Sequence, residues 1–207
     1  DGQAILEKDG TRIIRFYAKT CSYEIKDGTV TIDCYAFAEC KELQSITIPE
    51  GVLTIGEWAF AYCDNLETVV IPNTVKEMKC NAFWKCVNLK SIDIPNTLTE
   101  ISENVFNGCT NLMSVVIPQG VTEIGAGAFG RCTSLTNIVI PEGVTYIGYD
   151  AFNDCTGLTS LIIPSSVTEI EYSAFSGCTG LQEITVSSEN LLEDVKLPEG
   201  VKVIIAP

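Results

Sequence analysis

The side chains that could carry chemistry in this chain are ten cysteines, seven tyrosines and 27 aspartates and glutamates, because the sequence contains no histidine. The absence of histidine excludes Ser-His-Asp triads, Cys-His dyads and zinc sites with histidine ligands. No two cysteines stand in a C-x-x-C arrangement, so redox-active and zinc-ribbon motifs lack support as well. No general base or nucleophile arrangement stands out, and we therefore predict that the protein is not an enzyme.

Most cysteines recur at one interval. The column with a spacing of 23 residues consists of Cys40, Cys63, Cys86, Cys109, Cys132, Cys155 and Cys178. If successive repeats stack as coils, the Cα–Cβ bonds in this column run parallel, whereas a disulfide needs a Cβ separation of about 3.8 Å. We therefore interpret the column as a ladder of buried thiols that pack as small apolar groups. Cys21 lies outside the repeat columns, and a disulfide within the N-terminal segment stays open for it.

Two other patterns have chemical precedents. The string from Gly125 to Gly130 fits the dinucleotide-binding pattern G-x-G-x-x-G, but it lies inside one repeat rather than between a strand and a long helix. The carboxylates of Glu77, Glu100, Glu123 and Glu169 share one repeat position, where stacked charges could attract Ca²⁺. No D-x-D-x-D-G loop accompanies them, so we interpret this column as a solvated edge. We predict no cofactor and no metal site.

The elements that position these residues follow from the same period. The phenylalanine column consists of Phe37, Phe60, Phe83, Phe106, Phe129, Phe152 and Phe175. Each repeat reads L-x-x-I-x-I-P-x-G-V-T-x-I-x-x-x-A-F-x-x-C-x-x, with six uninterrupted copies between Leu43 and Gly180. A 23-residue period with this pattern predicts an α/β repeat solenoid of the leucine-rich class. One repeat buries too little apolar surface to fold alone, so neighbouring coils must complete the core.

Each repeat predicts three short elements. The alternation of apolar and polar residues over 45–48 predicts a half-buried strand, which Pro49 ends because proline donates no ladder hydrogen bond. The stretch 121–124 predicts a second short strand on another side of the coil. The spacing of Ala128, Phe129 and Cys132 predicts a single helical or 3₁₀ turn.

The chain divides into three predicted segments. Residues 1–19 are expected to form an N-terminal cap hairpin with Asp9-Gly10 in its turn. Residues 20–186 form the solenoid, with one degenerate repeat, six regular repeats and a partial last one. Residues 187–207 form a C-terminal cap or a junction to a further segment.

The outward positions of the main strands supply the first set of candidate binding residues. This set consists of Val70, Asp93, Val116, Asn137, Val139, Ser160 and Ile162. An apolar stripe from Val116 to Ile162 on a lightly charged strand face is a surface that repeat proteins offer to partners. The alternative is that β-branched residues occupy these positions only because they suit strands.

Aromatic residues outside the core columns form a second set. Tyr146, Tyr149 and Tyr172 lie toward one end, and a second aromatic group lies toward the other end. That second group consists of Tyr35, Trp58, Tyr62 and Trp84. Exposed aromatic rings stack on sugars or anchor protein interfaces, so glycan binding by the three tyrosines is a candidate function. Partial packing against neighbouring coils is the alternative explanation.

The charge of the chain narrows the classes of partner. The formal net charge is −14, which disfavours nucleic acid and anionic membrane surfaces. No apolar run approaches the roughly 18–20 residues that a membrane span needs, so no membrane insertion is expected in this segment. The first residue is Asp1, and we presume that a signal peptide has been removed.

The pattern I-P-x-x-V-T-x-I-x-x-x-A-F-x-x-C-x-x-L closely resembles the BspA-like leucine-rich repeats, over about three-quarters of the chain. That family is found largely on the surfaces or among the secreted proteins of anaerobic and gut-dwelling bacteria and of some mucosal protists. Its better-known members are adhesins that bind host matrix proteins such as fibronectin and fibrinogen, or other bacteria.

The resemblance implies a bacterial binding module that is extracellular or on the cell surface. It implies adhesion-type recognition of an extracellular protein ligand, with host matrix proteins among the candidates. From the outward residues of the main strands, we expect this recognition to use the exposed strand face. Two alternatives stay open: a glycan-binding module that uses the exposed tyrosines, and a structural spacer for a domain outside this sequence.

Overall fold

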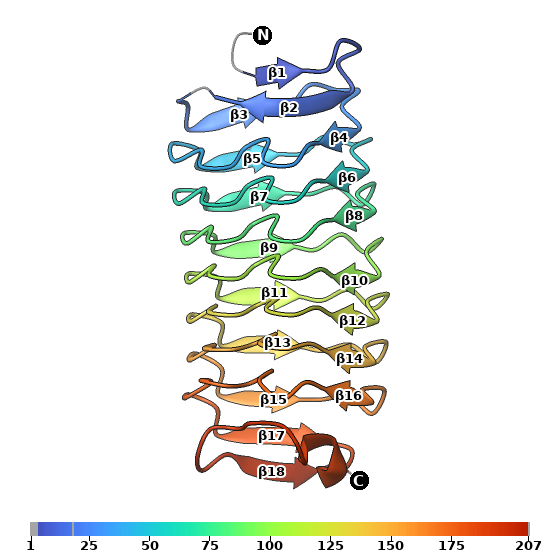
Figure 1. The fold of residues 1–207 in the computed structure, drawn as a ribbon, viewed down its shortest axis with the longest axis vertical. Helices are drawn as coiled ribbons and strands as arrows, with labels where there is room; N and C mark the ends of the chain where they lie inside the picture. The colour runs from blue at the N-terminus through green and yellow to red at the C-terminus, as the bar shows by residue number, and fades with distance from the viewer. Residues whose placement is uncertain (1–3, 18, 207) are drawn as a thin grey trace.

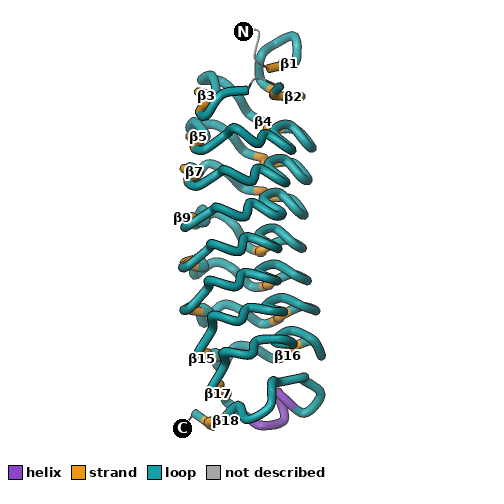
Figure 2. The backbone as a smooth tube through the Cα atoms, turned by 90° about the vertical axis from the view of Figure 1, so that its left-hand side faces the viewer, coloured by secondary structure: helices purple, strands orange, loops and turns teal. Residues whose placement is uncertain are grey.

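The computed structural model describes residues 4–17 and 19–206, and it shows one elongated stack of coils (Figure 1). The chain passes along the stack from one end to the other, so that the two termini lie at opposite ends. In the view turned by 90° the coils follow one another along the long axis (Figure 2). Each coil contains two short strands, and turns join them.

The longer strands form one face of the stack. They are β3 (Ser22–Glu24), β5 (Ser45–Thr47), β7 (Thr68–Val70), β9 (Ser91–Asp93), β11 (Ser114–Val116), β13 (Asn137–Val139), β15 (Ser160–Ile162), β17 (Glu183–Val186) and β18 (Lys202–Ile205). Pairing is parallel, and within the repeats it follows the 23-residue interval: Ser114 pairs with Ser91 on one side and with Asn137 on the other. In the three-residue strands the middle side chain is buried and both flanking side chains are exposed, because side chains alternate along a strand. The predicted main strand is confirmed.

The shorter strands form a second face. They are β4 (Thr31–Ile32), β6 (Thr54–Ile55), β8 (Glu77–Met78), β10 (Glu100–Ile101), β12 (Glu123–Ile124), β14 (Tyr146–Ile147) and β16 (Glu169–Ile170). They also pair in parallel at the interval of the repeat. At the N-terminal end, β1 (Ala4–Leu6) and β2 (Arg12–Phe16) form an antiparallel hairpin, and β2 pairs in parallel with β4. The second strand of the repeat therefore forms where the sequence predicts it.

The predicted helical turn does not form, and the α/β description is wrong in this respect. The N–H of Ala128 donates to Gly125 O within its own coil (3.2 Å), but the N–H of Phe129 donates to Ala151 O of the next coil (2.8 Å). A helix needs successive N–H groups to bond within one segment, so this alternation produces consecutive β-turns. Among the described residues, helix occurs in η1 (Glu189–Leu192), which lies outside the repeats. The fold is a β-solenoid of leucine-rich repeats.

Two positions in most of the repeat turns have a left-handed backbone conformation. The first column consists of Tyr35, Trp58, Asn81, Asn104, Gly127 and Asp150, and the second of Glu39, Tyr62, Lys85, Gly108, Arg131, Asp154 and Gly177. Such residues reverse the chain direction locally and prevent a helical turn from continuing. Most of these residues carry a β-carbon, so the hydrogen bonds between coils must offset the cost of this conformation.

The core consists of side-chain columns that run along the stack. The seven phenylalanines of the repeat are fully buried, and neighbouring rings stack with centroids 4.9–5.9 Å apart. Phe16 of the hairpin extends this column, since its ring stacks on Phe37 at 5.1 Å. The core is therefore continuous from the hairpin through the repeats.

The cysteines form a second column, and all ten are free thiols. The buried members are Cys63, Cys86, Cys109, Cys132, Cys155 and Cys178. Each of these thiols donates a hydrogen bond to the carbonyl of the phenylalanine 26 residues earlier, as Cys109 does to Phe83 O at 3.2 Å. The thiols thus satisfy a backbone acceptor in addition to filling space. Cys21 is exposed and unbridged, so the disulfide left open for it does not form.

Candidate functional site

The outward residues of the main strands line up on one face because the coils stack in register. The most exposed apolar side chains on this face are Val116, Val139 and Ile162, at 70%, 64% and 68% exposure. The Cα atoms of Val116 and Val139 are ladder partners, and Asp93 is the partner of Val116 on the other side. Val70 is also exposed on this face, on β7. We call the line of Val116, Val139 and Ile162 the apolar stripe.

The structure brings four of the predicted site residues around one surface hollow. Asn137 and Val139 of β13 and Ser160 and Ile162 of β15 line a depression of about 210 Å³. The carboxylate-bearing Glu142 lies at its edge. Val70 and Asp93 lie on the same strand face but outside this hollow. The site therefore combines an apolar stripe with a shallow recess that has polar groups around it.

The part of the chain that carries the stripe is acidic. Residues 91–195 contain thirteen aspartates and glutamates and one basic residue, Arg131. Residues 1–90 contain ten of the thirteen lysines and arginines, so the two parts of the chain differ strongly in charge. Arg131 itself lies 3.9 Å from the carboxylate of Asp154. The part of the chain that carries the stripe is therefore strongly negative.

The three predicted tyrosines lie on other parts of the coil and are not equivalent. The Tyr146 hydroxyl donates to Glu171 Oε1 at 3.1 Å, and burial together with this contact raises the pKa of Tyr146 to about 12. The hydrogen bond between Tyr149 and the same carboxylate raises the pKa of Tyr149. Tyr149 and Tyr172 are more than half exposed. The Tyr146 hydroxyl is thus already engaged, while the rings of Tyr149 and Tyr172 face solvent.

The second aromatic group forms one connected cluster. Tyr35 stacks on Trp58 with parallel rings 6.1 Å apart, and Trp84 packs edge-on against Trp58 at 5.1 Å and against Tyr62 at 4.7 Å. The ammonium of Lys85 lies 4.4 Å from the centre of the Trp84 ring. Tyr35, Trp58 and Tyr62 all have left-handed backbones, and so does Lys85. Asparagine and glycine at the equivalent positions of other repeats were the sequence signal for this geometry, and our sequence analysis missed it.

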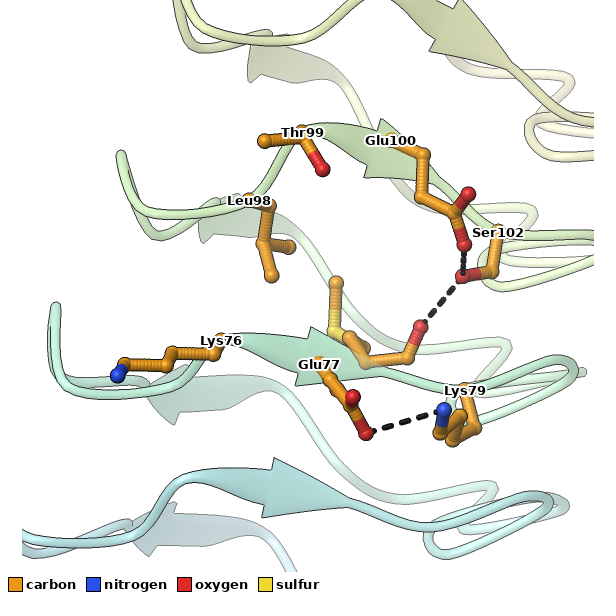
Figure 3. Close-up of a pocket in the computed structure, with 8 residues that line it drawn as sticks. Lys76, Glu77, Lys79, Leu98, Thr99, Glu100 and Ser102 are labelled. Carbon is orange, nitrogen blue, oxygen red and sulfur yellow. Dashed lines mark hydrogen bonds and ion pairs between the residues drawn. The ribbon is translucent and has the colours of Figure 1, made fainter.

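Two members of the glutamate column, Glu77 and Glu100, have side-chain partners within the protein (Figure 3). Glu77 lies 3.0 Å from the ammonium of Lys79. The Ser102 hydroxyl contacts Glu100 Oε1 at 3.0 Å and donates to Met78 O at 2.7 Å. These side chains line a depression of about 220 Å³ between two coils. Glu77 and Glu100 thus contact different partners, one on each coil, rather than a common point.

The comparisons with known proteins agree with this architecture. The BspA type leucine rich repeat region, in six copies, matches residues 16–133 and 99–204, and the chain belongs to this family. The T. pallidum leucine rich repeat protein TpLRR, whose crystal structure is known, is 32% identical to this chain, with 86% of this chain and 87% of that chain covered and a TM-score of 0.76. No curated protein matches the sequence.

Two further solved structures are similar in fold. A leucine-rich repeat protein from Eubacterium ventriosum is 27% identical over 86% of this chain, with a TM-score of 0.80, and the chain spans 48% of its length. A leucine-rich repeat protein from Bacteroides ovatus is 24% identical over 97% of this chain and 57% of its own, with a TM-score of 0.65. Within residues 4–17 and 19–206 no helix is long and apolar enough to span a membrane.

Proposed function

We propose that this chain is a non-enzymatic binding module that docks a protein partner on the strand face at the apolar stripe. The observation that supports this most is the exposure of three β-branched residues in one line, beside a hollow with polar edges. An exposed, regular apolar surface with a polar rim is typical of protein interaction sites. The buried middle residue of each main strand is enough to hold the strand on the core. It does not require large apolar side chains at the outward positions.

We propose that the partner presents a basic surface. The thirteen carboxylates against one basic residue over 91–195 make the part of the chain that carries the stripe strongly negative. Electrostatic complementarity would speed the encounter and disfavour acidic partners. By the resemblance to the BspA-like family, we propose an extracellular or cell-surface location for the chain and an adhesion role, with host matrix proteins as candidate ligands.

We also propose that the end segments cap the stack. β2 pairs with β4, and Phe16 continues the phenylalanine column, so the hairpin within 1–19 covers the first coil. In the segment 187–207, β18 pairs with β17, and the N–H of Lys196 donates to Tyr172 O at 2.7 Å. Residues 1–3, 18 and 207 lie outside the described residues. Covering the terminal coils is what a solenoid requires for solubility.

Introducing charge into the stripe should abolish binding. The double change Val116→Glu and Val139→Glu would place two carboxylates in the contact surface, and we expect affinity to fall about 100-fold or more. Binding to immobilised fibronectin and fibrinogen by surface plasmon resonance is the measurement. If the double variant binds as tightly as the unmodified chain, the strand face is not the protein-binding site.

Two control variants accompany this test. Val116→Thr with Val139→Thr keeps the branched shape, and Leu53→Glu adds a charge beside β6 on the second face. Both should retain binding within about tenfold, because neither places a charge on the stripe. If no matrix protein binds the unmodified chain, the adhesion proposal fails and the spacer alternative gains.

The dependence of the association rate on salt concentration tests whether the partner presents a basic surface. We expect the association rate to fall about tenfold or more between 50 mM and 500 mM NaCl, because screening weakens attraction between opposite charges on the two surfaces. Stopped-flow or surface plasmon resonance at several salt concentrations measures this rate. A rate that stays constant would contradict a basic partner while leaving the apolar contact intact.

A further inference from the structure

A hollow of about 510 Å³ lies on the turn side of the stack, away from the apolar stripe. Its lining includes Trp58, Trp84 and Tyr149, so it brings together members of the two aromatic groups that the sequence places toward opposite ends. The other lining groups are mainly amides and charged side chains, among them Asn104, Asn107 and Asp150. Of the three tyrosines expected to bind glycans, Tyr149 is the one that lines this hollow.

The hollow exists because one coil carries small residues where its neighbours carry large ones. Ala126 occupies the repeat position that holds Glu103 in the preceding coil and Tyr149 in the following coil. Gly127 follows it with a left-handed backbone (φ 63°). An added β-carbon at Gly127 would collide with the side-chain oxygen of Asn104. The glycine that resembles part of a dinucleotide motif therefore makes room for an asparagine side chain.

The floor of the hollow is held by hydrogen bonds. Asn107 Nδ2 donates to Asn104 Oδ1 at 3.0 Å and to Gly127 O at 3.2 Å, and Asn104 Nδ2 donates to Glu103 Oε1 at 3.1 Å. These bonds fix two amide groups against the backbone, and Asp150, two coils further along the stack, lines the same hollow. A ligand thus meets polar groups that are already ordered.

The aromatic wall is ordered as well. Trp84 is fixed on several sides by the edge contacts with Trp58 and Tyr62 and by the ammonium of Lys85. The Tyr149 ring, on the other side of Ala126, is 53% exposed. Rings that are fixed before binding lose little conformational entropy when a ligand stacks on them.

The side chains that line the hollow indicate which class of ligand fits it. Sugar rings present C–H faces that stack on aromatic side chains, and hydroxyl groups that need both donors and acceptors. Amide and carboxylate side chains supply both. Glu103 and Asp150 disfavour phosphate and other anions, and the one cation in the lining, Arg131, already lies beside Asp154.

We propose that this hollow binds a neutral oligosaccharide, with a sugar ring stacked on Trp84 or Tyr149 and hydroxyl groups on the amides of Asn104 and Asn107. The site is independent of the protein-binding stripe, because the two share none of their lining residues. The chain would then combine a protein-binding strand face with a sugar-binding turn face.

The test is an array of neutral, sialylated and sulfated oligosaccharides, followed by isothermal titration calorimetry with the strongest neutral oligosaccharide. Ala126→Tyr fills the hollow with the residue that the same repeat position holds in the next two coils, Tyr149 and Tyr172, so the fold is preserved. We expect Ala126→Tyr and Trp84→Ala to weaken binding at least tenfold. Tyr172→Ala, at the same repeat position but outside the hollow, should stay within twofold.

The results that would contradict the sugar-binding proposal differ from those that would contradict protein binding at the apolar stripe. Absence of binding to every oligosaccharide, binding to sialylated or sulfated sugars alone, or unchanged binding in Ala126→Tyr would each reject it. Val116→Glu with Val139→Glu should leave sugar binding within twofold. If that double variant loses protein binding and keeps sugar binding, the two sites are distinct.

Discussion

Replacing Phe106 with alanine should lower the free energy of unfolding by about 3–5 kcal/mol. The ring is fully buried and stacks between Phe83 at 5.9 Å and Phe129 at 5.6 Å. Its loss leaves a cavity in the middle of the column, and both neighbouring coils lose a contact surface that they cannot replace. Urea unfolding followed by circular dichroism at pH 7 measures the change.

The matched control is Val116→Ala, on the strand face of the following repeat. Val116 is 70% exposed, so its truncation should change the free energy of unfolding by about 0.5 kcal/mol or less. A small effect of Phe106→Ala, similar to that of the control, would show that the coils do not share one continuous core.

Raising the pH from 8 to 10 should unfold the protein cooperatively, because the buried thiols resist ionisation. Burial raises the pKa of Cys109 to about 12 and that of Cys178 to about 11, from an ordinary value of 9.0. Burial also raises the pKa values of Cys86, Cys132 and Cys155, and the contact with Cys40 together with burial raises that of Cys63. Below pH 9 the folded and unfolded states both keep these protons, so the full stability is present.

Above pH 9 the unfolded state releases the thiol protons while the folded state retains them, so stability falls as the pH rises toward the folded pKa values. Each such thiol contributes a loss of about 1.4 kcal/mol between pH 8 and pH 10. The hydrogen bond that raises the pKa of Cys63 lowers the pKa of Cys40, so the contributions of these two thiols oppose each other. The other five buried thiols act together, which makes the total loss large compared with the usual stability of a domain. Equilibrium unfolding at several pH values measures this slope.

The control for the thiols is the double variant Cys109→Ala and Cys132→Ala. We expect its slope between pH 9 and pH 10 to be about two-fifths shallower, since two of the five buried thiols outside the Cys40–Cys63 pair are removed. Tyr146 is still present in the variant and contributes only near and above its ordinary pKa of 10.0. An unchanged slope would assign the alkaline transition to groups other than the cysteine column.

Much of the fold could be predicted from local patterns. Alternation over 45–48 located β5, and the in-register pairing of Ser114 with Asn137 follows directly from the 23-residue period. The outward position of Val116 and Val139 could be predicted for the same reason, because the side-chain direction in a strand depends on parity alone. The identity of a molecule that binds this strand face depends on the chemistry of the partner as well. The repeat pattern therefore does not predict it.

The turns could not be predicted from the same kind of pattern. The spacing of Ala128, Phe129 and Cys132 suits a helical turn, but the bond from Phe129 to Ala151 of the next coil competes with it. Left-handed conformations at Trp58 and Arg131 are unfavourable for residues with a β-carbon, so local propensity predicts another structure. Contacts between coils, which only form in the stack, overcome that preference.

Spacing along the chain is enough to predict the period, the two strand positions, the buried phenylalanine and cysteine columns and the exposed stripe. Spacing does not predict that the turns avoid helix or that Trp84 and Tyr149 line one hollow, because both features depend on what a residue contacts in the coils on either side of it. Asn104 fills the space left by Gly127, 23 residues away, and neither residue alone signals that contact.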